Sequence, residues 1–250
     1  MNILHYVFAS IFAIILGQIS AHLNKKLPPV VAEEITYKEF FKGLRSDFKI
    51  DFLYTGIFLI LFNCFVYFLN STLDIYLYMI VSFALSIVFS VDVRYRLIPD
   101  ETHIIIVIAG MINLLANLSN WWDYLLGALI GGSIFWGLGL LSLLIFRKEG
   151  MGFGDVKLMA ALGFMFGIKN ILVITLVSFV FGALIGGALL VLKKDESDGY
   201  IPFGPFIVTA AIILMFVPAD VIINIYITFC TWLGLKMSDG LYFLMSKMLK

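Results

Sequence analysis

Apolar runs of bilayer-spanning length, separated by short polar breaks, fill almost the whole chain. A hydrocarbon core of about 30 Å needs roughly 20 apolar residues per helix. The pattern predicts an all-α fold, a polytopic membrane helix bundle with eight or nine transmembrane spans. The expected spans lie near residues 3–22, 52–69, 75–91, 103–117, 124–146, 156–168, 170–192, 204–217 and 221–235. Turn residues support the breaks between them, including the one at 167–170.

Composition agrees with a membrane protein. Hydrophobic residues make up 62% of the chain and charged residues 14%, whereas soluble domains are nearer half apolar and a quarter charged. The formal net charge is zero, so no excess of positive charge is available to neutralise nucleic acid. The two cysteines, Cys64 and Cys230, lie inside apolar runs, which predicts neither a disulfide framework nor a thiolate metal site.

The basic residues indicate the orientation. Sixteen of the 17 lie in alternating loops and in the tail from Lys236, and Lys169 is the exception. Because cytoplasmic loops are enriched in Lys and Arg, we expect these segments to be cytoplasmic, with the N-terminus outside if there are nine spans. No basic residue precedes the first apolar run, which favours a retained span over a cleaved signal peptide. The loop 22–51 carries apolar positions at helical spacing and is either an amphipathic surface helix or a solvated connector.

Two carboxylates stand at the ends of apolar runs. Asp92 directly follows LYMIVSFALSIVFSV, and Asp155 opens a later run after Gly152 and Gly154. Burying an ionisable residue at membrane depth costs several kcal/mol unless a partner compensates, so such a residue is a functional hypothesis by default. The structural alternatives are a helix N-cap for Asp155 and, for Asp92, an anchor paired with a neighbouring arginine. By topology both lie at the same membrane face.

Other polar residues near these runs have simpler interpretations. Asp100 follows Pro99 and precedes THIIIVIAGMI, which predicts an N-cap. Lys157 is a solvated basic residue or a partner for an anionic state. The three histidines, His5, His22 and His103, are too scattered for a metal site, and the last two are expected at span ends as interfacial residues. No GxSxG or HExxH motif occurs, so no other nucleophile or metal centre is indicated.

Two neighbouring carboxylates suit hydrolysis of a peptide. Brought within a few ångströms, they cannot both ionise comfortably, so one keeps a proton while the other stays charged. The ionised carboxylate takes a proton from water, and the protonated one polarises the scissile carbonyl. The pair titrates as a unit.

At this point the residues resemble a family. GFGDVKLMAALG, from Gly152, resembles the GxGD signature of type IV prepilin peptidases. DVRYRLIPD, from Asp92 to Asp100, resembles that family's other aspartate motif, and IPFGPF, at 201–206, resembles its Pro-Phe-Gly-Pro turn. The resemblance places the catalytic pair at Asp92 and Asp155, the two residues that the burial argument selects.

The resemblance implies a multi-pass aspartyl protease of a prokaryotic cytoplasmic (inner) membrane. It would cleave the basic leader from type IV prepilins or type II secretion pseudopilins at the cytoplasmic face, with no cofactor and no metal. Gly152 and Gly154 would let the backbone approach the substrate closely, and acidic residues, Asp100 among them, could attract the leader. Pro202, Gly204 and Pro205 would form either a re-entrant turn under the site or a helix break.

The N-terminal part fits the family less closely. GQISAHLNKKLP, at 17–28, keeps the length and ends of a family stretch, with Lys26 where arginine is usual. The paired CxxC motifs of bifunctional members are absent, which removes a zinc site and leaves N-methylation with S-adenosylmethionine open. The predicted division is a first span plus cytoplasmic amphipathic loop at 1–51, a candidate methyltransferase part, and a GxGD peptidase domain at 52–250.

Three other functions compete with this interpretation. A proton-coupled transporter could use the two aspartates as a relay, but it predicts ionisable residues near the midplane and paired broken helices. A pilus-assembly scaffold that has lost catalysis would tolerate losing either aspartate, and both are present. A GxGD protease of the presenilin or signal peptide peptidase type would carry a Tyr-Asp pair, whereas Asp92 follows Val91.

Overall fold

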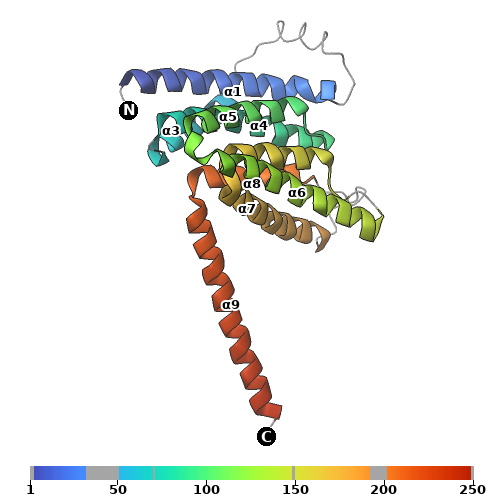
Figure 1. Cartoon of the computed structure of the whole chain (residues 1–250). Helices are drawn as coiled ribbons and strands as arrows, with labels where there is room; N and C mark the ends of the chain where they lie inside the picture. Colours follow the sequence, from blue (N-terminus) through green and yellow to red (C-terminus); the bar gives the residue numbers. More distant parts are fainter. Residues whose placement is uncertain (1–2, 32–50, 70, 148–149, 192–201, 249–250) are drawn as a thin grey trace. The chain divides into compact units, whose positions relative to one another are not determined.

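The chain is built from helices throughout the part that a computed structural model describes, residues 3–31, 51–69, 71–147, 150–191 and 202–248. It forms two compact units, Met1–Phe216 and Val217–Lys250. Their elements, labelled in Figure 1, are α1 Ile3–Val31, α3 Phe52–Phe68, α4 Thr72–Tyr95, α5 Asp100–Ala116, η1 Leu118–Asn120, α6 Trp121–Phe146, α7 Phe153–Val191, α8 Gly204–Phe216 and α9 Ala219–Met248. The predicted all-α class is confirmed, and within the described ranges there is no strand. The expected surface helix within 22–51 lies largely outside the described residues.

The predicted number of spans is not confirmed. Within the described ranges, four helices are long and apolar enough to cross a membrane, or five if α8 and the first part of α9 count as one broken span. The predicted and observed numbers of spans differ because hydropathy identifies apolar runs but does not determine how long a helix each run forms. The runs at 52–69, 103–117 and 204–217 form helices of only 17, 17 and 13 residues.

The apolar helix α7 consists of two helices that meet at a reversal of the chain. Its backbone leaves the helical conformation at Gly167, where φ is 81° and ψ is 176°. A Cβ atom at Gly131 of α6 would lie 2.5 Å from the Met159 carbonyl oxygen and 2.9 Å from a side-chain carbon of Ile171. Those two residues would be about 18 Å apart in a straight helix, so the chain must turn back between them. The sequence predicted a break at this place.

Glycine at position 167 is required by this reversal. Its φ and ψ fall in a region that is essentially restricted to glycine, and an added Cβ would collide with the carboxylate of Asp123. That carboxylate accepts a hydrogen bond from the Ile168 N–H at 3.2 Å, so it caps the second helix of the pair.

Gly167→Ala should therefore destabilise the protein by about 1–3 kcal/mol. The measurement is thermal unfolding in detergent, with Gly137→Ala as the matched control because a Cβ there meets nothing within 4 Å. Equal stability of the two variants would show that the reversal at Gly167 is absent.

Glycines also allow α6 and α7 to pack closely together. A Cβ at Gly127 would collide with the Gly163 carbonyl, and one at Gly163 would collide with the Gly127 carbonyl. Small residues of this kind let helices approach closely where no hydrophobic effect drives them together. This packing holds the first half of α7 in place. Asp155 lies in the first turn of that half.

The helix α4 lies in the core of the first unit and packs against α1, α3, α5 and α8. Half of its residues are buried. It is tied to α1 by a hydrogen bond between the hydroxyls of Ser20 and Ser86, 2.6 Å apart. Because α4 is fixed on several sides, the aspartate in its last turn has a well-defined position.

Candidate active site

Asp92 lies in the last turn of α4, where the helix ends at Arg96 in a left-handed conformation with φ 55°. The Arg96 N–H donates to the Asp92 carbonyl at 2.9 Å, which closes the helix. The Asp92 residue is only 5% exposed. Its Oδ2 accepts a hydrogen bond from the Gly204 N–H at 2.9 Å, so the carboxylate points into the protein.

The residues Pro202 to Pro205 start a helix beside this carboxylate. Gly204 is the first residue of α8, and Pro205 takes the second position, where proline has no hydrogen-bonding N–H to lose. A Cβ at Gly204 would lie 2.5 Å from Asp92 Oδ2 and 3.0 Å from Asp92 Cγ. Only glycine allows this approach. The segment thus forms the start of α8 and directs the positive end of the α8 dipole at Asp92.

Asp155 is the third residue of α7 and is also 5% exposed. Its N–H donates to the Gly152 carbonyl at 3.1 Å. Its Oδ1 is buried and makes no hydrogen bond, so this oxygen does not act as a helix cap. The charge of Asp92 acts on the Asp155 carboxyl, so the two groups lie within electrostatic reach of each other. A buried carboxylate oxygen without a partner is costly in a folded protein and needs an explanation.

The N-terminal turn of α5 braces the start of α7. The sequence predicted Asp100 as the N-cap of α5, and this was wrong. Pro99 occupies the N-cap position, and Asp100 is the first helical residue. Asp100 instead accepts a hydrogen bond from Lys157 Nζ at 2.8 Å. This bond holds the pKa of the Asp100 carboxyl below its usual value. Both side chains are substantially exposed, so the ion pair contributes little stability, but it joins α5 to α7 two residues after Asp155.

His103 makes the second link between α5 and α7. The sequence suggested an interfacial residue, but His103 is only 7% exposed. Its Nε2 lies 3.3 Å from the Gly154 carbonyl oxygen, and its Nδ1 lies 3.5 Å from Asp100 Oδ1. Gly154 is confined from another side, because a Cβ there would lie 3.1 Å from Ile98 Cβ. The sequence alone does not predict this contact of His103, because the contact depends on how α5 and α7 pack.

His103→Phe should lower turnover in whatever reaction Asp155 performs by about 10²-fold, because the Gly154 carbonyl loses its hydrogen-bond donor and the adjacent aspartate shifts. His103→Gln can place an amide N–H near the position of Nε2 and should restore most of the rate. The measurement is kcat and KM for both variants, with thermal stability as a check on folding. Equal losses in the two variants would contradict a role in positioning the loop.

The described residues offer no metal site. No group of three or more His, Cys, Asp or Glu side chains converges in the described ranges. Cys64 and Cys230 are free thiols. Most of the loop expected to serve methylation lies outside the described ranges, so no residue is assigned to a methyl donor.

Comparisons with known proteins agree with the motifs. Residues 79–187 match the type IV leader peptidase family, and this segment contains both aspartates. The prepilin leader peptidase/N-methyltransferase of Xanthomonas campestris pv. campestris is 36% identical over 133 residues, which cover 53% of this chain and 46% of that protein. The proteins of the same name from Stutzerimonas stutzeri and Pseudomonas aeruginosa are 38% and 36% identical over 124 residues, in each case 48% of this chain and 42% of theirs. The chain therefore matches less than half the length of these relatives. No solved structure matches the chain.

Proposed function

Because residues 79–187 match the type IV leader peptidase family, we propose that the chain is a membrane aspartic endopeptidase acting on type IV prepilins or type II secretion pseudopilins. The observation that carries this proposal is that Asp92 at the end of α4 and Asp155 at the start of α7 are both buried and lie within electrostatic reach of each other. Apolar helices and the family fit an inner-membrane protein of a prokaryote. We place the reaction at the cytoplasmic face, because the loops around both aspartates carry basic residues.

The hydrogen bonds suggest different catalytic roles for the two aspartates. The Gly204 N–H donates to Asp92, and such a donor stabilises an ionised carboxylate. Asp155 Oδ1 has no donor, which suits a carboxyl that carries a proton. Asp92 would act as the general base and Asp155 as the general acid, while the proton is shared by the pair as a whole.

Hydrolysis follows from this arrangement. Asp92 removes a proton from a water molecule, whose oxygen attacks the scissile carbonyl carbon, and Asp155 gives its proton to the carbonyl oxygen. The tetrahedral intermediate then collapses. The C–N bond breaks, the leaving nitrogen takes the proton from Asp92, and the new carboxylic acid returns one to Asp155. The products are a leader with a free carboxyl group and a mature chain with a free amine.

The remaining residues would support this pair. Gly152 would let the substrate backbone approach the mouth of α7, and Gly154 would fix the start of α7 through its contacts with Ile98 and His103. Pro99, Asp100 and Lys157 hold the start of α5 against α7. N-methylation of the new amine by the part at 1–51, with S-adenosylmethionine as donor, is a second activity that the relatives' name suggests. We propose it together with the division of the chain at residue 51.

The test uses the purified chain in lipid with a synthetic prepilin that carries a basic leader. Mass spectrometry follows leader release and the mass of the new N-terminus, with and without S-adenosylmethionine. Release of the leader supports the peptidase, and a further gain of one methyl group supports the second activity. An intact substrate together with proton flux into liposomes would instead favour the transporter.

A further inference from the structure

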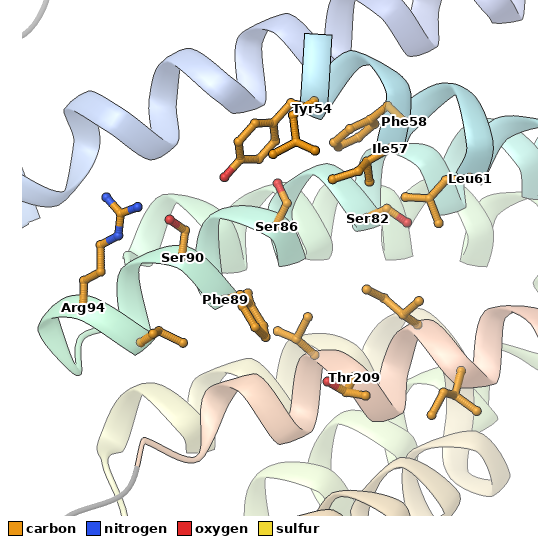
Figure 2. A pocket seen from close by; sticks show the side chains of 15 residues that line it. Tyr54, Ile57, Phe58, Leu61, Ser82, Ser86, Phe89, Ser90, Arg94 and Thr209 are labelled. Carbon is orange, nitrogen blue, oxygen red and sulfur yellow. The ribbon is translucent and has the colours of Figure 1, made fainter. Parts of the chain in front are cut away.

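A groove of about 540 Å³ opens between α3, α4 and α8, and Asp92 is not among the residues that line it. Figure 2 shows its lining side chains, with the hydroxyls of Ser82, Ser86 and Ser90 in a row along α4. The other walls are mainly aliphatic and aromatic. Neither Asp92 nor Asp155 lines this groove.

The groove is open to the apolar part of a bilayer. Leu53, Phe89 and Val93 line it and are 70%, 45% and 51% exposed. Phe89 and Val93 stand on α4, one of the helices that is long and apolar enough to cross a membrane, and Leu53 stands on the shorter helix α3. Large apolar side chains exposed on a spanning helix face lipid, so the groove meets the acyl region of a bilayer.

Its length matches one leaflet. The lining residues on α4 run from Ser82 to Arg94, twelve helical steps and therefore about 18 Å along the helix axis. Half of a hydrocarbon core of about 30 Å is close to this length. A single acyl chain lying along α4 would reach from the membrane surface to the middle of the bilayer.

One end of the groove carries three polar side chains that can donate hydrogen bonds. Arg94 is the last residue but one of α4, and it makes no ion pair with any residue in the described ranges. The hydroxyls of Ser90 and Tyr54 also have no hydrogen-bond partner there. Figure 2 places these three side chains toward the same end. A guanidinium with adjacent hydroxyls suits the oxygens of a phosphate group.

We propose that this groove is a binding site for an anionic phospholipid, with one acyl chain along α4 between α3 and α8 and the phosphate at Arg94. Basic pockets between spanning helices are a known way to hold anionic headgroups. The charge favours a lipid over the substrate, because the proposed substrate carries a basic leader that Arg94 repels. The site does not depend on the peptidase function.

The test loads the full-length protein into nanodiscs of phosphatidylcholine and phosphatidylglycerol in equal amounts, releases it into mild detergent and counts retained lipids by native mass spectrometry. Arg94→Gln should lower the ratio of retained phosphatidylglycerol to phosphatidylcholine about fivefold, the contribution expected of one basic side chain at an anionic surface. Ile212→Trp, which fills the apolar part, should lower retention of both lipids. Lys236→Gln, an exposed basic residue outside the groove, is the matched control.

Two results would overturn the proposal. The first is a lipid ratio in Arg94→Gln equal to that of wild type or of Lys236→Gln, which would mean that Arg94 holds no headgroup. The second is unchanged lipid retention in both groove variants together with a raised KM for a cleaved substrate, which would assign the groove to the substrate. A failure to cleave prepilin would leave the lipid result unaffected, so the two proposals fail independently.

Discussion

Replacing either Asp92 or Asp155 by Asn should reduce the rate of leader release by at least about 10³-fold. An Asn at 92 cannot take a proton from water, and an Asn at 155 cannot give one to the carbonyl oxygen. Each change keeps the size of the side chain, and both residues are buried, so the loss reports on chemistry rather than packing. The measurement is the single-turnover rate of leader release from a synthetic prepilin in lipid.

The control for these variants is Asp123→Asn, which alters a carboxylate at the other end of the first helix of α7, where it caps Ile168. It should lower thermal stability modestly and leave leader release close to the wild-type rate. If Asp92→Asn or Asp155→Asn cleaves as fast as this control, the carboxyl pair does not perform the reaction.

Gly204→Ala should lower turnover by about 10²-fold or more, the second-largest effect that the structure predicts. The new methyl group would stand 2.5 Å from Asp92 Oδ2, so the carboxylate or the start of α8 must move. A displacement of about 1 Å at a catalytic group is enough for a loss of this size. The same movement breaks the hydrogen bond from the Gly204 N–H, which stabilises the ionised form of Asp92.

Gly187→Ala is the matched control for this change, because a Cβ at that helical glycine meets nothing within 4 Å. The kinetic readout is kcat against KM, and thermal unfolding checks the fold. A normal kcat for Gly204→Ala would show that α8 does not approach Asp92 as the structure has it.

Hydropathy was sufficient to predict the fold class and most of the helices. The all-α architecture and the break near Gly167 both follow from the sequence, because apolar runs and turn residues are local signals. The length and direction of each helix depend instead on the residues of other helices that pack against it. The reversal at Gly167 needs Asp123 and the glycines of α6, and no local pattern shows that these meet.

The two aspartates could be selected from the sequence because a carboxylate at the end of an apolar run is costly. The residues that contact them could not be predicted from the sequence. The contact of Gly204 with Asp92 and that of His103 with Gly154 join residues 112 and 51 positions apart, so they arise only when α4, α5, α7 and α8 pack. Asp100 illustrates the same limit: local sequence suggested a cap, and its partner Lys157 comes from another helix.

The proposed reaction requires that α4 and α7 bring residues 92 and 155 together in one site. The most direct measurement introduces Asp92→Cys and Asp155→Cys into a chain carrying Cys64→Ser and Cys230→Ser, and follows bridging by a short bifunctional thiol reagent in lipid. The control pairs Asp92→Cys with Lys169→Cys, which lies two residues past the reversal at Gly167, and Gly167 is about 18 Å along the first half of α7 from Asp155. We expect rapid bridging of 92 to 155 and none of 92 to 169. Equal bridging of both pairs, or no bridging of 92 to 155, would contradict the proposed reaction.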